Sequence, residues 1–223
     1  MHQTSPDQSP RGPWVPRCAS SCDFLAENEH RTANHFALLA SYVQMKGAEL
    51  AKMALPTAAA IDHFVQCIQG QMQSAARLHR LLSDHAERTA IELSQLLPSV
   101  CEPFASMYAG QIAVAEDFAF DCTVRPDQCL PISQIVAEAM TNVAKHARAE
   151  EGLRIIVRCR ATDAGVWVEV IDNGRGLPDG FRPETSGGLG FRLMRLHAAA
   201  LGGTITFKST GDGLSVGITV PLD

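Results

Sequence analysis

The feature that most restricts the fold of this 223-residue chain is an apolar strand that ends in a carboxylate between glycines. The segment VEVIDNGRGLPDG, residues 168–180, starts with side chains typical of a buried strand and stops at Asp172. Gly174 and Gly176 follow at once, and a second glycine cluster lies at residues 186–190 after a short polar stretch. A carboxylate placed there, with two glycine clusters around so short a loop, indicates a binding site.

The spacing of these groups predicts what they bind. An Asp at the end of a strand accepts a hydrogen bond from an exocyclic amine such as adenine N6, and glycines let the backbone approach a flat ring. The second cluster, Gly187-Gly188-Leu189-Gly190, opens a predicted helix, whose free N–H groups and dipole favour phosphate. Residues 177–186, between the clusters, are predicted to form a short lid.

A helix upstream carries polar side chains on one face. In EAMTNVAKHA, residues 138–147, Glu138, Asn142 and His146 are spaced i, i+4, i+8, and Lys145 lies three positions after Asn142. A carboxylate, an amide oxygen and a cation on one stripe suit a polyphosphate with Mg²⁺, which prefers hard oxygen ligands. A solvated polar face is the alternative interpretation of this helix by itself.

Residues 91–223 alternate between helical and extended patterns. Helices are predicted at 91–108, 127–148 and 189–201, and strands at 112–115, 118–123, 153–160, 166–172, 204–209 and 214–221. Several helices against one mixed, largely antiparallel sheet give an α+β fold, an α/β sandwich.

The N-terminal part differs in composition and in the pattern of its apolar residues. Residues 1–22 are rich in Pro, Ser and Gln, which predicts a disordered tail. Two long helices, residues 23–55 and 58–88, are joined by a Leu-Pro-Thr turn, which predicts a helical hairpin at 23–90. The hairpin leaves an apolar face uncovered, so we expect a homodimer in which two hairpins form a four-helix bundle.

Composition excludes several classes of function. The net charge of −5 argues against non-specific nucleic-acid binding, and no run of residues is apolar enough for a membrane helix or a signal peptide. The seven cysteines show no paired CxxC spacing, which favours reduced thiols in the cytoplasm.

The order of these motifs resembles the N, G1 and G2 boxes of the GHKL ATP-binding fold, which sensor histidine kinases share with gyrase and MutL. The resemblance covers residues 91–223, and the series EAMTNVAKHA, VIDNGRGLP, SGGLGFRLM and LGGTITF is similar to a histidine kinase. It implies that the chain binds ATP with Mg²⁺. The residues it implies for the site are Asn142 as the metal ligand with Glu138 beside it, Lys145 and His146 near the phosphates, Asp172 and Thr219 at the adenine, and Gly174, Gly176, Gly188 and Gly190 around the pocket and lid.

The first predicted helix contains AENEHRTANHFALL, residues 26–39, which resembles the HRxxN signature of the histidine kinase subfamily that includes the HWE kinases. His30 matches the phosphoacceptor, and Glu27 lies at a matching offset, although Ala33 replaces the usual Lys. A neutral imidazole is a competent nucleophile near pH 7, and a carboxylate such as Glu27 can hold its tautomer and take up the proton.

The leading hypothesis is therefore an ATP-dependent histidine autokinase that passes the phosphoryl group to an aspartate of a response-regulator receiver. A phosphotransfer protein with a degenerate ATP-binding-like domain, a serine kinase of the anti-sigma-factor type and a non-enzymatic dimeric scaffold are the alternatives. Only 22 residues precede the hairpin, so we expect the signal to come from a separate sensor protein or from a longer parent chain.

Overall fold

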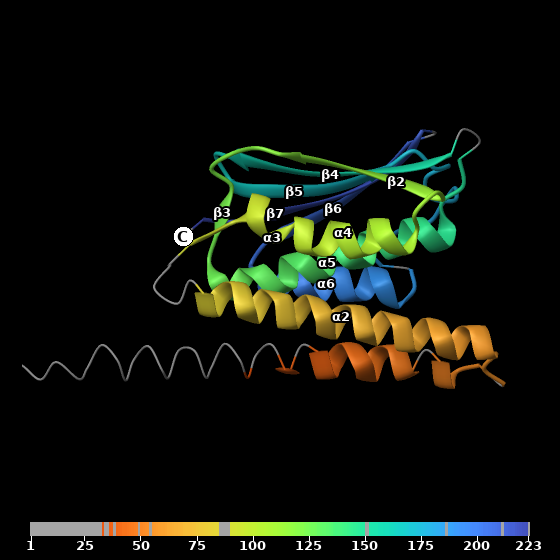
Figure 1. Cartoon of the computed structure of the whole chain (residues 1–223). Helices are drawn as coiled ribbons and strands as arrows, with labels where there is room; N and C mark the ends of the chain where they lie inside the picture. The colour runs from red at the N-terminus through yellow and green to blue at the C-terminus, as the bar shows by residue number, and fades with distance from the viewer. Residues whose placement is uncertain are drawn as a thin grey trace, which may run out of the picture.

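The structure, a computed structural model, describes residues 33, 36–37, 39–48, 50–53, 55–84, 90–149, 152–185, 187–210 and 212–222. Its fold is α+β, as the sequence predicts: helices pack on one face of a mixed sheet (Figure 1). The elements in chain order are α2 (Ala58–Asp84), β1 (Ile91–Glu92), α3 (Leu93–Leu96), α4 (Pro98–Met107), β2 (Ile112–Phe118), β3 (Thr123–Val124), α5 (Pro126–His146), β4 (Leu153–Thr162), β5 (Gly165–Asp172), α6 (Leu189–Ala200), β6 (Thr204–Thr210) and β7 (Gly213–Val220).

The helical hairpin precedes the sheet. The described residues between 33 and 51 are mostly helical and form what we call the first hairpin helix, and α2 follows after a turn at residues 52–57. Thr57 caps α2, because its Oγ1 accepts a hydrogen bond from the backbone N–H of Ala60 at 3.2 Å. The two helices touch, since a Cβ added to Gly47 would lie 4.0 Å from the ring of Phe64. The predicted tail, residues 1–22, lies outside the described residues.

The main sheet has five strands in the order β2-β4-β5-β7-β6. The pair β2–β4 is parallel and the other three pairs are antiparallel, so the sheet is mixed and largely antiparallel, as predicted. Alternate strand residues such as Val157, Val168 and Ile218 are buried in one apolar core with Ile135 and Met140 of α5. In Figure 1, α4, α5 and α6 lie on the same side of the sheet, and α2 runs along the outer side of α5 and α6.

Two predicted elements differ from the structure. Ile91 and Glu92 were expected in a helix but form β1, because Ile91 pairs with Val124 of β3 in a separate two-stranded ribbon. The short strand expected at 112–115 extends to Phe118 as β2, which pairs with β4 along its whole length, whereas of the strand expected at 118–123 only Thr123 is otherwise extended, in β3. Both differences come from pairing with distant segments, which the local pattern of side chains does not contain.

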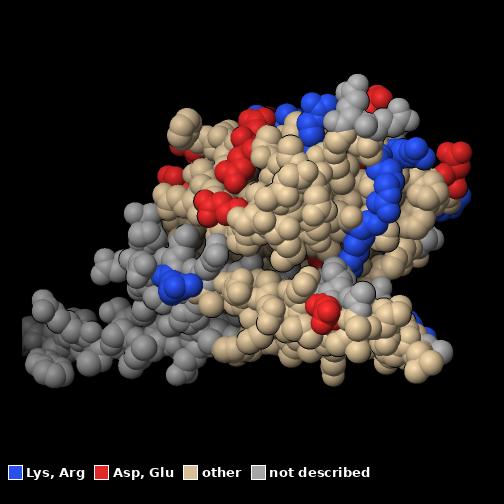
Figure 2. All heavy atoms as spheres, turned by 45° about the vertical axis from the view of Figure 1, so that its right-hand side comes forward, with Lys and Arg blue, Asp and Glu red and all other residues tan. Residues whose placement is uncertain are grey.

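The outer surface of the hairpin exposes large apolar side chains. The described ones are Phe36, Val43, Met53, Leu55, Ile61, Val65 and Met72. In Figure 2 the described part of the hairpin, at the bottom of the view, shows few charged side chains. No helix among the described residues has both the length and the apolar character needed to cross a membrane.

Candidate nucleotide-binding site

The middle of α5 meets the first turn of α6, and a glycine makes this approach possible. Glu138 and Asn142 lie one turn apart on α5, and Gly190 is the second residue of α6. A Cβ added to Gly190 would lie 3.0 Å from Asn142 Oδ1 and 3.0 Å from Glu138 Oε2. The amide and the carboxylate therefore converge on the N-terminus of α6.

The N-terminus of α6 is open to an anion. The helix has twelve residues from Leu189 to Ala200, and its N-cap residue Gly188 has extended backbone and makes no side-chain capping hydrogen bond. The first backbone N–H groups of a helix have no partner within it and, with the helix dipole, favour phosphate. Gly187 has a φ of +102°, and a Cβ there would lie 2.8 Å from the ring of Phe191. The tight turn into α6 therefore requires glycine at position 187.

Asn142 fits the phosphate end of a nucleotide with Mg²⁺. Its Nδ2 is buried and has no hydrogen-bond partner in the described part of the protein, although most buried polar atoms have one. Glu138 is 2% exposed, so this site holds a carboxylate and an amide oxygen away from bulk water. Oxygen ligands of this kind suit Mg²⁺, which takes few protein ligands beside the phosphates of its nucleotide. Lys145 is half-buried and His146 exposed in the last turn of the same helix.

Asp172 is held rigidly at the end of β5. Its Oδ1 accepts a hydrogen bond from the backbone N–H of Gly174 at 2.7 Å, and the side chain is 6% exposed. Burial raises the pKa of Asp172, and hydrogen bonds from the backbone N–H groups of Gly174 and Leu214 oppose this rise. The carboxylate is thus fixed in one orientation, as recognition of a base requires.

The loop after β5 also contacts the end of α5. A Cβ added to Gly174 would lie 2.8 Å from Asp172 Oδ1 and 2.9 Å from the Cβ of Ala147. Gly176 has a φ of +70°, the left-handed conformation that glycine adopts without strain. Ala147 follows α5 directly, so the same helix carries Glu138 and Asn142 near its middle and ends beside Asp172.

Thr219 does not join the site. The sequence led us to expect its hydroxyl beside Asp172, but strand register puts the two side chains on opposite faces of the sheet. Thr219 pairs with Trp167, so these two side chains share one face of the sheet. Asp172 is an even number of residues from Val168 and so shares the other, buried face with Val168 and its partner Ile218. The residue of β7 that does contact Asp172 is Leu214, through its backbone N–H.

The predicted lid is fastened to the domain at both ends. The backbone N–H of Leu177 donates to Ser209 Oγ at 2.6 Å near its start. Near its end, Arg195 of α6 donates a hydrogen bond to the carbonyl oxygen of Pro183. The ring of Phe191 lies 5.4 Å from that of Phe181 in the lid, so α6 also holds the lid by an aromatic contact.

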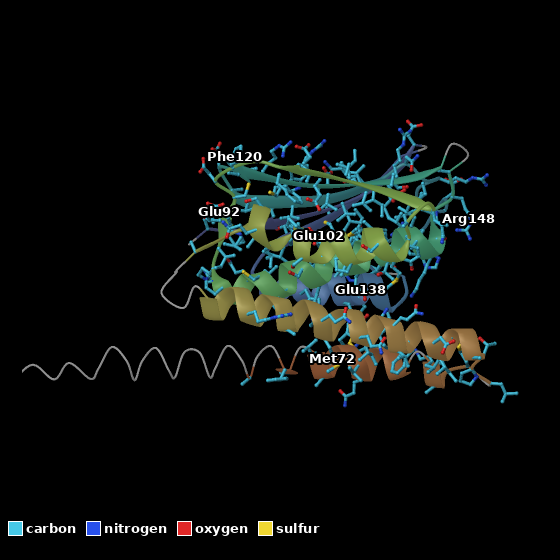
Figure 3. The ribbon with its side chains drawn as sticks, viewed as in Figure 1. Met72, Glu92, Glu102, Phe120, Glu138 and Arg148 are labelled. Carbon is cyan, nitrogen blue, oxygen red and sulfur yellow. The ribbon has the colours of Figure 1, made fainter. Side chains whose placement is uncertain are left out.

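The sequence analysis missed a residue of the hairpin that reaches this site. Lys46 Nζ lies 3.5 Å from Glu138 Oε2, and the side chains are only 7% and 3% exposed. The ammonium also lies 5.5 Å from the centre of the ring of Tyr42. Figure 3 shows Glu138 between the sheet-bearing part of the chain and the hairpin. Lys46 and Glu138 are 92 positions apart, so no local pattern pointed to this pair.

The predicted phosphoacceptor His30 and its neighbour Glu27 lie outside the described residues. Their roles therefore stay predictions.

Comparison with known proteins agrees with this geometry. Residues 128–223 match the family described as histidine kinase-, DNA gyrase B-, and HSP90-like ATPase. The chain is 23% identical over 212 residues to blue-light-activated histidine kinase 2 of Erythrobacter litoralis, covering 89% of this chain and 57% of that protein. It is 23% identical over 211 residues to the sensor histidine kinase PdtaS of Mycobacterium tuberculosis, covering 89% of this chain and 39% of PdtaS.

Among solved structures, the chain is similar to the histidine kinase domain of a blue-light-activated histidine kinase from Erythrobacter litoralis. The TM-score is 0.67 with 23% sequence identity, and the match covers 93% of this chain and 95% of that one. This likeness confirms the predicted α+β fold. The family match at residues 128–223 and the similarity to histidine kinases over most of the chain together support a sensor histidine kinase catalytic core.

Proposed function

We propose that the chain is an ATP-dependent histidine autokinase that phosphorylates His30 and passes the phosphoryl group to an aspartate of a response regulator. The observation that carries this proposal is the convergence of Glu138, Asn142 and Gly190 at the start of α6, with the Asp172 loop beside Ala147 at the C-terminal end of α5. In this proposal residues 23–90 form the dimerisation and phosphoacceptor domain and residues 91–223 the catalytic domain.

Each part of the site has a distinct role. Asp172 accepts a hydrogen bond from the adenine amine, and the glycines at 174 and 176 leave room for the base. The N–H groups at Leu189 and Gly190 face the phosphates, with Lys145 and His146 as nearby cations. Asn142 Oδ1 and Glu138 hold Mg²⁺, which neutralises charge on the transferring phosphate when it is bound.

The transfer itself needs a nucleophile in line with the γ-phosphorus. In the proposal a ring nitrogen of His30 forms a bond to phosphorus as the bond to the bridging oxygen breaks and ADP leaves. Glu27 keeps the imidazole in the reactive tautomer and takes up its proton. The product is a phosphoramidate, which is labile in acid and stable in base.

The surface of the hairpin supports a homodimer. Val43, Ile61 and Val65 are each about two-fifths exposed and Phe36 is 66% exposed, on a surface with few charges (Figure 2). Such a face is typical of helices that pack against a second copy. We propose further that the dimer acts in the cytoplasm, receives its signal from a sensor region or a separate sensor protein, and has a response-regulator receiver domain as partner.

Radiolabelled ATP with Mg²⁺ tests the proposed activity. The protein should take up label that acid removes and base does not. His30→Gln should take up none, whereas the matched variant His35→Gln should label normally. Asn142→Ala should suppress labelling with the fold intact, because position 142 faces the nucleotide rather than the core. Acid-stable label, or full labelling of His30→Gln, would instead favour the serine kinase. Nucleotide binding without any labelling would favour the phosphotransfer protein.

A further inference from the structure

The ion pair between the hairpin and α5 is unusual for the burial of its lysine. Lysine is among the residues least often buried, and a buried one requires a charged partner. Lys46 is 7% exposed and has that partner in Glu138. Lys52, six residues further along the chain, is exposed. Lys46 is therefore buried because of where it lies in the fold. A cation–π contact with the ring of Tyr42, at 5.5 Å, also stabilises the ammonium there.

The partner of Lys46 belongs to the proposed phosphate end of the site. The oxygen that Lys46 contacts, Glu138 Oε2, is the same atom that converges with Asn142 Oδ1 at the start of α6. An ammonium group held there compensates the charge of Glu138 that would otherwise favour Mg²⁺. Lys46 and the metal therefore compete for one carboxylate.

The docked hairpin brings Lys46 to the proposed phosphate end of the site. Lys46 follows His30 by sixteen residues in the sequence, and a helix running through both would separate their Cα atoms by about 24 Å. If the helix predicted at residues 23–55 includes both residues, a hairpin that presents Lys46 to Glu138 holds His30 away from a phosphate at the same site. Phosphorylation within one subunit then requires the Lys46–Glu138 contact to break.

We propose that Glu138 is a cation-exchange switch: it holds Lys46 and keeps the hairpin docked in the nucleotide-free protein, and Mg²⁺-nucleotide displaces Lys46 and releases the hairpin. The proposal rests on the nucleotide site of the proposed function. It assigns to Lys46 an inhibitory role, since the docked state must be broken before nucleotide binds fully.

Amine acetylation followed by mass spectrometry tests the exchange in the wild-type chain, with Lys52 as the internal control. Without nucleotide, Lys46 should react about tenfold more slowly than Lys52, since it is buried and paired. A non-hydrolysable ATP analogue with Mg²⁺ should bring Lys46 close to the rate of Lys52. The same analogue with EDTA should leave Lys46 protected. Equal reactivity of the two lysines in the free protein, or a Lys46 that stays protected with Mg²⁺-nucleotide bound, would overturn the proposal. Release by nucleotide without Mg²⁺ would overturn the exchange of cations.

Substitution gives an independent measurement of the competition. Lys46→Met should raise the affinity for the Mg²⁺-bound analogue about tenfold, because no docked state competes with binding. Lys46→Arg, which keeps the charge, and Lys52→Met, which changes an exposed lysine, should both stay near the wild-type affinity. Unchanged affinity in Lys46→Met contradicts the switch, and a lower affinity would make Lys46 a ligand of the phosphates instead. Should Lys46→Met fail to fold, the labelling of the wild type still decides.

Failure of the switch and failure of the proposed function give different results. Neither test above involves phosphoryl transfer, so a protein that never labels His30 can still show the exchange of Lys46. Conversely, acid-labile label on His30 together with a permanently protected Lys46 would refute the switch alone.

Discussion

Replacing Asp172 by Asn is expected to change which base the site accepts. The side-chain oxygen of Asn can still accept the hydrogen bond that Asp172 Oδ1 takes from the N–H of Gly174 at 2.7 Å. The second oxygen of the carboxylate then becomes an NH₂ group. Where the carboxylate accepts from the 6-amino group of adenine, the amide presents a donor to a donor.

The size of the effect follows from the charge of the acceptor. A hydrogen bond to a charged group contributes about 1.5–3 kcal/mol, and 1.4 kcal/mol is tenfold in affinity, so ATP should bind about 10- to 150-fold more weakly. Inosine triphosphate has a carbonyl oxygen in place of the amine, so its affinity should rise relative to that of ATP. Burial raises the pKa of Asp172, so ionisation of this group costs stability as the pH rises through that pKa. The uncharged variant avoids this cost, so unfolding should not account for a weaker affinity.

Titration calorimetry with both nucleotides and Mg²⁺ measures this change. Glu169→Gln is the matched control, because Glu169 is a buried carboxylate of the same strand that lies on the opposite face and accepts a hydrogen bond from Ser215. The control should bind ATP within about twofold of the wild type. If Asp172→Asn keeps the wild-type affinity for ATP, or lowers the affinities for ATP and inosine triphosphate equally, Asp172 does not recognise the base.

Three further outcomes are expected. Gly190→Ala should lower the affinity for Mg²⁺-nucleotide about tenfold by calorimetry, because its Cβ would lie 3.0 Å from Asn142 Oδ1, and normal binding by this variant would contradict the crowding. The control Gly70→Ala, with open space around it, should leave the affinity unchanged and raise the free energy of unfolding by about 1 kcal/mol. Burial lowers the pKa of His197 from 6.5 to about 4, so the unfolded state takes up a proton first and the free energy of unfolding should fall as the pH is lowered from about 6.5 to about 4. His197→Leu should flatten this part of a plot of the free energy of unfolding against pH. A wild-type plot without the fall would refute the assignment. Val65→Glu places a charge on the exposed hairpin face and should convert a dimer to a monomer in light scattering, whereas a monomeric wild type at micromolar concentration would exclude the dimer.

The elements around the site could be predicted because they depend on local patterns. Apolar alternation located β4 and β5, and helical spacing located α5 to within two residues at each end. The glycine clusters also located the turn into α6, because a positive φ or a close approach of side chains requires glycine, which is visible in the sequence. In the structure Gly190 lies beside Glu138 and Asn142, and the roles expected for these residues stay predictions.

What the sequence did not contain was strand register and contact between distant helices. Thr219 was assigned by the family resemblance, as a hydroxyl on the final strand, but a shift of one residue moves a side chain to the other face of a sheet. Ile91 joins a strand because of Val124. Lys46 resembles any helical lysine until α5 is packed beside it, since its partner is 92 positions away.

The geometry of α5 separates the proposed base-recognition site from the Lys46–Glu138 ion pair. Glu138 and Ala147 are nine residues apart, about 13 Å along the helix, with Lys46 at one end and the Asp172 loop at the other. Changes separated by more than about 7–10 Å without shared partners have nearly additive effects. Asp172→Asn and Lys46→Met should therefore combine additively in nucleotide affinity. Asn142→Ala and Lys46→Met should not, because both act on the cation held at Glu138. Under the proposed switch, the hairpin regulates the phosphate end of the site without altering its choice of base.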